Sequence, residues 1–314
     1  MKLLTQLSPW PAELRGGAVA IGNFDGVHRG HARIVESLLA SARRCGGPAI
    51  VFTFDPHPVR LLRPAQAPPP LTWTDRKAEL LGELGVDVML AYPTDDELLS
   101  FTADEFFERI VREQLSARAM VEGPNFFFGA DRSGDIQVLG GLCQSAGIEL
   151  EIVEPLVEDG AIVSSSRTRQ AVAAGDVDEA RRLLTRPYRI RGMVIHGAGR
   201  GTKIGFATAN IDAIDTLLPA SGVYAGVATY DRSQWPTAIN IGPKPTFGES
   251  SLSVEAHLIG FSGSLYGQPL EVDFLARLRD IQPFDHVDAL RRQLAEDVAT
   301  ALKIADADSS QRSN

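Results

Sequence analysis

The strongest constraint on the fold is a change of pattern near residue 186. Before it, short apolar runs such as "AIVFTF" and "VDVMLAY" alternate with stretches of helical periodicity such as "HARIVESLLASARRC". Strands that alternate with helices of this length predict βαβ units and a parallel sheet. After it, β-like runs such as "GVYAGVATY" and "SVEAHLIGF" are separated by Gly, Pro and Asn. This second pattern is typical of a small antiparallel barrel, so the predicted class is α/β followed by β.

The change of pattern divides the chain into two predicted domains, at 1–185 and 186–305. One helix is expected over 165–184, at the end of the first domain. An amphipathic helix over 285–305 is expected to close the second domain. Residues 306–314, "DADSSQRSN", are expected to form a disordered tail.

Composition narrows the class of protein. The 31 Lys and Arg against 40 Asp and Glu give a formal charge of −9, which disfavours a nucleic-acid partner. The two cysteines, Cys45 and Cys143, form no CxxC pattern, which favours a reducing compartment. No apolar run approaches the ~20 residues of a membrane span, and the N-terminus lacks a signal-peptide core. We therefore expect a cytoplasmic protein without membrane partners. A monomer or weak homo-oligomer is also expected, although no sequence feature specifies the oligomeric state.

The stretch "GNFDGVHRGH", Gly22 to His31, joins a predicted strand to a predicted helix through a glycine turn. Helix starts at the carboxyl edge of a parallel sheet favour anions. His28 and His31 are three residues apart and share a helix face, where imidazoles can donate hydrogen bonds to phosphate or to a departing pyrophosphate. Two surface histidines near a helix start are an open alternative. A zinc site fits less well, because helical metal sites more often use i, i+4 pairs.

This stretch resembles the HxGH signature of nucleotidylyl transferases through His28, Gly30 and His31. "FTFDPHP" is similar to a segment of bacterial FAD synthetases, and "VSSSRTRQAV" resembles the signature ISSTxIR, whose hydroxyls and arginine hold a triphosphate. The resemblance implies a Rossmann-like nucleotidylyl transferase domain in which His28, His31 and Arg169 are catalytic. The positions it assigns to nucleotide or flavin binding are Gly22, Phe24, Asp25, Gly26, His57, Asn125, Arg132, Ser164, Ser165 and Ser166.

Simpler interpretations and departures accompany these assignments. His57 is also consistent with a turn residue between prolines, and the serines with helix N-caps. "EGPNFFFGADRSGD" is similar to the family segment GxDFxFGxxRxGd, but Asn125 replaces the usual aspartate and Phe127 a usual basic residue. Thr168 replaces the isoleucine of the second signature. The departures at 125 and 127 bear on flavin-nucleotide contacts rather than on the fold.

The segment "HGAGRGTKIGFATANI" is a near miss of a P-loop, which fails at Thr202 and Ile204. A glycine-rich hairpin with solvated basic residues is the simpler interpretation. The segment also resembles the riboflavin kinase signature HGxxRGxxxGFPTANI. That resemblance implies a barrel of the riboflavin kinase type, with Gly197 and Lys203 in the ATP loop and Thr208 and Asn210 as oxygen donors for Mg²⁺ and phosphate. Ala207 replaces the signature's proline.

Glu255 lies in the alternating run "SVEAHLIGF", which also resembles the kinase. A carboxylate there can accept the proton of the flavin 5′-hydroxyl as that oxygen attacks the γ-phosphorus. An exposed strand glutamate is the alternative. Arg279 matches a family arginine near the flavin, whereas Gly260 and Ser264 replace acidic residues common in the family.

Taken together, the motifs resemble the bacterial family of bifunctional riboflavin kinase/FMN adenylyltransferases from about residue 17 to residue 301. The resemblance implies that riboflavin and ATP give FMN and ADP, and that FMN and ATP give FAD and pyrophosphate, with Mg²⁺ serving both steps. One alternative keeps the first domain but uses another acceptor, such as a nicotinamide or pantetheine phosphate, and leaves the kinase-like half unexplained. Another is a flavin-binding or regulatory protein with decayed sites.

Overall fold

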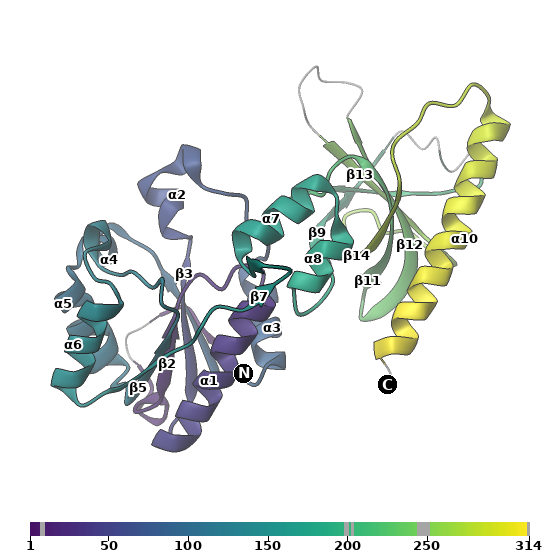
Figure 1. The fold of residues 1–314 in the computed structure, drawn as a ribbon. Coiled ribbons are helices and arrows are strands. Elements are labelled where there is room, and N and C mark those ends of the chain that lie inside the picture. The colour runs from purple at the N-terminus through teal and green to yellow at the C-terminus, as the bar shows by residue number, and fades with distance from the viewer. Residues whose placement is uncertain (7–9, 198–200, 202–203, 244–251, 313–314) are drawn as a thin grey trace. The chain divides into compact units, whose positions relative to one another are not determined.

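The computed structural model describes residues 1–6, 10–197, 201, 204–243 and 252–312 (Figure 1). The chain forms two compact units, one of residues 1–68 and 73–164 and the other of residues 69–72 and 165–314. The compact units therefore divide at Ser164, and the domain boundary after residue 185 stays a prediction. The reason is that the helices after Ser164 bury Val172, Val177 and Ala180 in the same core as the strands of the second unit.

The first unit is built on a parallel sheet of six strands in the order β1-β4-β3-β2-β5-β6. The strands are β1 (Lys2–Leu4), β2 (Ala18–Ile21), β3 (Ala49–Asp55), β4 (Val88–Pro93), β5 (Ala119–Glu122) and β6 (Glu149–Ile152). This confirms the predicted α/β class. The hydrogen-bonded order places β2 between β3 and β5, so the chain winds outward from β2 in both directions.

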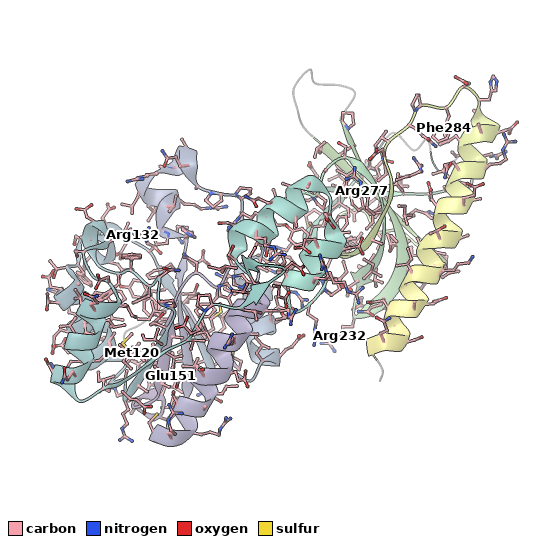
Figure 2. The ribbon with its side chains drawn as sticks, in the orientation of Figure 1. Met120, Arg132, Glu151, Arg232, Arg277 and Phe284 are labelled. Carbon is pink, nitrogen blue, oxygen red and sulfur yellow. The ribbon has the colours of Figure 1, made fainter. Side chains whose placement is uncertain are left out.

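Helices cover both faces of this sheet. They are α1 (Arg29–Cys45), α2 (Pro58–Leu62), α3 (Thr74–Glu83), α4 (Asp96–Ser100), α5 (Ala103–Phe106), the π-helix η3 (Phe107–Gln114) and α6 (Ile136–Ala146). Alternate residues of β2 enter different cores, because side chains of a strand point to opposite faces. Ala20 packs with Leu38 of α1, whereas Val19 packs with Ile110 of η3. Met120 of β5 lies inside this unit (Figure 2).

Short elements connect the larger ones. They are the 3-10 helices η1 (Ala12–Leu14), η2 (Pro64–Gln66) and η4 (Ala130–Arg132), and the paired strands β7 (Val157–Glu158) and β8 (Ala161–Ile162).

The second unit is a closed antiparallel barrel in the order β10-β13-β12-β11-β14-β9. Its strands are β9 (Tyr188–Ile195), β10 (Ala209–Asp212), β11 (Gly222–Tyr230), β12 (Ser233–Pro243), β13 (Leu252–Leu258) and β14 (Pro269–Arg279). Its helices are α7 (Ser165–Ala174), α8 (Val177–Leu183) and α10 (Val287–Arg312), and α10 runs along the barrel (Figure 1). The predicted barrel and closing helix are confirmed.

Two local predictions were wrong. The single helix expected over 165–184 is two helices, because Gly175 adopts φ +75° between α7 and α8. The tail expected to be disordered from residue 306 continues α10 as far as Arg312. Asp308 is buried there and forms an ion pair with Arg181 of α8 at 2.6 Å, which fixes the last turns of the helix. Among the described helices, none has the length and hydrophobicity that a bilayer crossing requires.

Candidate active sites

The first candidate site lies where the strand order of the parallel sheet reverses. β2 pairs with β3 on one side and with β5 on the other, and the chain leaves β2 at Ile21. Open α/β sheets bind ligands in the crevice outside the carboxyl ends of such neighbouring strands. The stretch Gly22–His28 forms the turn between β2 and α1 at this place.

The turn has an uncommon backbone that buried side chains hold. Phe24 and Val27 have φ of +46° and +41°, and both side chains are buried in the core beside α1. Gly30 leaves room for a close approach, because a Cβ there would lie 3.0 Å from His28 Nδ1 and 3.1 Å from the Val163 carbonyl oxygen. The turn is therefore set by packing on one side and by a close backbone approach on the other.

The two histidines of the turn lie together, as their spacing predicted. His28 Nδ1 accepts a hydrogen bond from the His31 backbone N–H at 3.2 Å, which makes His28 the N-cap of α1. The two rings stack with their centroids 3.6 Å apart. His31 Nδ1 is buried and has no hydrogen-bond partner among the described residues. A buried nitrogen of this kind fits a site that a ligand completes.

The electrostatics of the turn keep the His31 ring neutral at physiological pH. Burial lowers the pKa of His31 well below its usual value, and the nearby His28 and Lys77 lower it further. A neutral imidazole has one N–H donor, so the ring can donate a hydrogen bond to a phosphate oxygen without carrying a charge.

Other predicted residues of this unit follow the carboxyl ends of β3 and β5. His57 caps α2 by accepting a hydrogen bond from the Val59 N–H at 3.1 Å, which is the simpler role considered for it. Asn125 is exposed after β5. The Arg132 guanidinium (Figure 2) lies 4.2 Å from the centroid of the Phe127 ring. Phe127, which replaces a basic residue usual in the family, thus contacts Arg132, a predicted binding residue.

The ISSTxIR-like motif spans the division between the units. Ser164 ends the first unit, whereas Ser165 and Ser166 open α7 in the second. Arg169 Nε donates to the Pro69 carbonyl oxygen at 2.9 Å. Thr168 is fully buried, so it replaces the usual isoleucine inside the core.

The second candidate site lies in the barrel. Asn210 of β10 pairs in register with Glu255 of β13, and Thr208 Oγ1 donates to Glu255 Oε2 at 3.4 Å. The Asn210 side chain covers Gly197 so closely that a Cβ at 197 would lie 2.1 Å from its amide nitrogen. Four predicted residues are thus brought together. Lys203, the remaining predicted member of the ATP loop, lies outside the described residues.

A hollow of about 320 Å³ opens between the barrel and α10, beside these residues. Thr208 and Glu255 line it together with the apolar side chains of Ile239 and Leu294. Arg279 also lines it, and its guanidinium donates to Asp297 of α10 at 2.7 Å. An apolar hollow with a carboxylate and a hydroxyl suits a flat aromatic ligand that carries a reactive alcohol.

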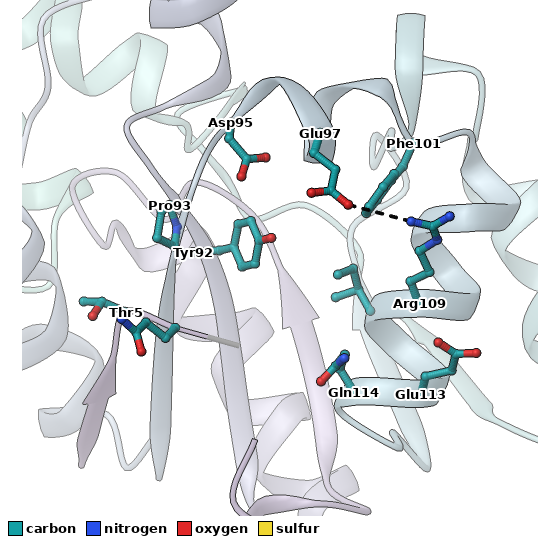
Figure 3. A pocket seen from close by; sticks show the side chains of 11 residues that line it. Thr5, Tyr92, Pro93, Asp95, Glu97, Phe101, Arg109, Glu113 and Gln114 are labelled. Atoms are coloured by element: carbon teal, nitrogen blue, oxygen red, sulfur yellow. Dashed lines mark ion pairs between the residues drawn. The ribbon is translucent and has the colours of Figure 1, made fainter. Parts of the chain in front are cut away.

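Another hollow, of about 560 Å³, lies beside the ends of β1 and β4 (Figure 3). Its lining includes Asp95, Glu97 and Glu113, and Arg109 lies 3.8 Å from Glu97. None of the predicted motif residues lines it. The excess of carboxylates disfavours an anionic nucleotide, so we assign it no part in the reaction.

Sequence reasoning missed several buried ionisable residues, and three of them, Glu122, Asp297 and Lys77, lie beside the candidate sites or hold one of their residues. Glu122 ends β5 and accepts a hydrogen bond from the Ile21 N–H at 2.8 Å. Asp297 holds Arg279, and Lys77 lies on α3 close to the histidine turn. The only sequence signal for Glu122 was a carboxylate at the end of the apolar run "AMVE". Asp297 and Lys77 occur in charged helices and gave no signal.

Comparisons with known proteins agree with this division of sites. A family model described as FAD synthetase matches residues 11–167, and one described as riboflavin kinase matches residues 184–305. A relative from Pseudomonas fluorescens, named bifunctional riboflavin kinase/FMN adenylyltransferase, is 38% identical and covers 97% of this chain and 98% of its own. The protein of the same name from Escherichia coli K12 is 35% identical, with 96% and 97% covered.

The chain is also similar to a solved structure from Streptococcus pneumoniae named "Macrolide-efflux Protein". The TM-score is 0.85 and the sequence identity 29%, with 96% of this chain and 98% of that chain covered. The likeness extends over both units.

Proposed function

Because this chain belongs to the family of bifunctional riboflavin kinase/FMN adenylyltransferases, we propose which of its residues carry each reaction. The chain phosphorylates riboflavin to FMN and adenylylates FMN to FAD, with ATP as co-substrate of both steps. The observation that carries the assignment is the gathering of Gly197, Thr208, Asn210 and Glu255 beside an apolar hollow.

In the kinase reaction Glu255 acts as the general base. The isoalloxazine ring occupies the apolar hollow, and the ribityl 5′-hydroxyl reaches the Glu255 carboxylate. Glu255 accepts the hydroxyl proton as the oxygen attacks the γ-phosphorus, and ADP leaves. Thr208 donates a hydrogen bond to Glu255 and so orients the carboxylate before the substrate binds.

Thr208 and Asn210 also fit a magnesium ion. A hydroxyl and an amide offer the oxygen donors that Mg²⁺ prefers, and Mg²⁺ typically takes few protein ligands and completes its shell with water and phosphate. Within the described parts of the chain, no group of three or more His, Cys, Asp or Glu could hold a metal by itself. When bound, the ion would neutralise charge on the transferred phosphate.

In adenylyl transfer, positioning and hydrogen bonding replace a protein nucleophile. An FMN phosphate oxygen attacks the α-phosphorus of ATP, and pyrophosphate leaves. His28 and His31 stand at the N-terminus of α1, where N–H groups favour anions. We assign His31 to the phosphates on the strength of its unpartnered Nδ1. Arg169 and the serines of its motif are assigned to the triphosphate by their match to the family signature.

No observation favours another acceptor or a non-catalytic flavin-binding protein. The cytoplasmic location, the absence of nucleic-acid partners and the monomeric or weakly oligomeric state stay predictions.

Separate loss of the two activities tests the assignment. His31→Ala, supplied with riboflavin, ATP and Mg²⁺, is expected to accumulate FMN without FAD. Glu255→Gln, which keeps the shape but not the basicity of the side chain, is expected to form FAD only when FMN is supplied. Chromatography of the flavins measures both outcomes.

His286→Ala serves as the matched control, because His286 is exposed and belongs to neither motif. It is expected to retain both activities. If folded His31→Ala or Glu255→Gln protein lost both activities, or neither, the two-site assignment would be wrong.

A further inference from the structure

Lys77 is a buried lysine close to the turn that carries His28 and His31. Its side chain projects from α3, and only 8% of the residue is exposed. Lysine is almost never buried unless its charge is paired. Its position therefore calls for a reason beyond packing.

A hydrogen-bonded chain connects Lys77 to the turn. Lys77 Nζ donates to Thr53 Oγ1 at 3.3 Å, and Thr53 is fully buried on β3. Thr53 Oγ1 in turn donates to the backbone carbonyl of Asn23 at 3.1 Å. The chain runs from α3 through β3 to the turn between β2 and α1. It meets that turn five residues before His28.

Charged groups surround the Lys77 ammonium. Burial lowers the pKa of Lys77, whereas Asp25 of the turn and Asp55 at the end of β3 raise it. The ammonium also acts on His31, since it lowers the pKa of that ring together with burial and His28. Lys77 thus has carboxylates and a proposed catalytic histidine within electrostatic reach.

We propose that Lys77 is a positioning residue for adenylyl transfer, whose buried ammonium fixes the turn carrying His28 and His31 through Thr53. The proposal rests on the role given above to His31. A second effect follows from the charge: with Lys77 in place, protonation of His31 is disfavoured. The ring therefore keeps one nitrogen without a proton and one N–H donor over a wider pH range.

The placement matters because the reaction depends on geometry. A displacement of about 1 Å in groups that orient two phosphate-bearing substrates lowers the rate by about 100-fold. The φ values of the turn at Phe24 and Val27 are ones that side chains rarely adopt. A fixed anchor below it therefore contributes directly to the reactive geometry.

Three variants of the full chain separate the two effects. Lys77→Met removes the charge and the donor, Lys77→Arg keeps the charge, and Thr53→Val breaks the hydrogen-bonded chain while leaving the ammonium. Each variant is assayed for FAD formation from FMN and ATP across pH 5 to 9. FMN formation from riboflavin, which takes place in the other unit, is measured in the same protein as the internal control.

We expect Lys77→Met to lower kcat for FAD formation at least 10-fold and to move the acid limb of its pH profile to higher pH. The shift is expected because His31 is protonated more readily once the ammonium is gone. Lys77→Arg should keep the acid limb in place. Thr53→Val should lower kcat without moving the limb, and FMN formation should be unchanged in all three.

The opposite results would overturn the proposal. Lys77→Met with the wild-type kcat and pH profile excludes a positioning role. Equal losses in Lys77→Met and Lys77→Arg with an unmoved limb indicate packing alone. If Lys77→Met does not fold, Thr53→Val with wild-type kcat still refutes the anchor. Wild-type FAD formation by His31→Ala would instead refute the role of His31, which is a separate failure.

Discussion

At the scale of single residues, Glu122 shows how one buried carboxyl supports the first site. Glu122 is 3% exposed and accepts the hydrogen bond of the Ile21 N–H, the last residue of β2. The β2–β5 ladder pairs only Ala18 with Ala119 and Val19 with Met120, so Ile21 lies beyond it. The side chain replaces the missing strand partner at the point where the turn begins.

Burial determines the protonation state of Glu122. Desolvation raises the pKa of Glu122 well above its ordinary 4.5, although the bond from Ile21 opposes the rise. Between 4.5 and the raised value, the folded chain keeps a proton that the unfolded chain has lost. The contribution of Glu122 to the free energy of unfolding is therefore greatest below pH 4.5 and falls as pH rises through this window.

Glu122→Gln is expected to remove this pH dependence, because the amide keeps the acceptor oxygen but cannot ionise. The free energy of unfolding of the variant minus that of the wild type should increase as pH rises. The increase should be at most about 1.4 kcal/mol per pH unit inside the window. Urea unfolding of both proteins at pH 5, 6, 7 and 8 measures the difference. A constant difference across these pH values would contradict the assigned protonation state.

Glu122→Ala supplies the matching control for the hydrogen bond. It leaves the buried Ile21 N–H without its acceptor, which costs roughly 1–3 kcal/mol at any pH. A loss this large in the glutamine variant at pH 5 would show that the amide does not reproduce the bond.

At the scale of secondary-structure elements, Gly175 decides how α7 and α8 pack. Its φ of +75° reverses the chain between the two helices. A Cβ at this position would lie 2.5 Å from Arg277 Nη1 and 2.6 Å from the Tyr224 hydroxyl. The Arg277 side chain is held in place because it donates hydrogen bonds to the carbonyl oxygens of Ala174 and Ser221. Moving it away from a Cβ at position 175 would strain these bonds.

Gly175→Ala is therefore expected to lower the free energy of unfolding by about 1–3 kcal/mol, from the strained φ and the crowding. Gly141→Ala is the matched control, because Gly141 lies inside α6 and a Cβ there meets nothing within 4 Å. The free energy of unfolding of this control should rise by about 0.5–1 kcal/mol, because alanine is more favourable than glycine in helix interiors. Thermal unfolding of both variants compares them, and equal effects of one sign would contradict the argument.

At the scale of the whole molecule, the two proposed sites lie in one chain, and we expect FMN to pass between them by free exchange. The residues proposed for the kinase reaction lie in the second unit, and the histidine turn lies in the first. FMN released by one chain is chemically the substrate of any other. Synthesis of FAD from riboflavin therefore requires both active sites in the same solution. The two active sites can be on different chains.

A mixture of His31→Ala and Glu255→Gln proteins is expected to form FAD from riboflavin, although neither forms it alone. FAD should appear after a lag, because free FMN must first accumulate to the level that the other protein binds. Flavin chromatography over time measures the lag, and added FMN should abolish it. A mixture that accumulates FMN without FAD would contradict free exchange between chains.

The sequence by itself determined the alternation of strands and helices before the barrel, the barrel itself and the motifs of both sites. These are local properties: a side-chain period of 2 or 3.6, turn glycines, and short spacings such as that of His28 and His31. Such local patterns do not depend on contacts with distant parts of the chain. For this reason the two histidines were found together, as their spacing predicted. The contact of Thr208 with Glu255 joins residues 47 apart and was decided by the pairing of the barrel strands instead.

Only the tertiary structure decided which charged side chains are buried and what they hold. Glu122 lies 101 residues from Ile21, and Lys77 lies 24 residues from Thr53, so no local pattern joins either pair. The same cause explains two features of organisation that no local pattern shows: α7 and α8 pack with the barrel, and Asp308 holds the end of α10, both through contacts distant in sequence. Burial depends on the assembled core, whereas residue type indicates only how often such a side chain is buried.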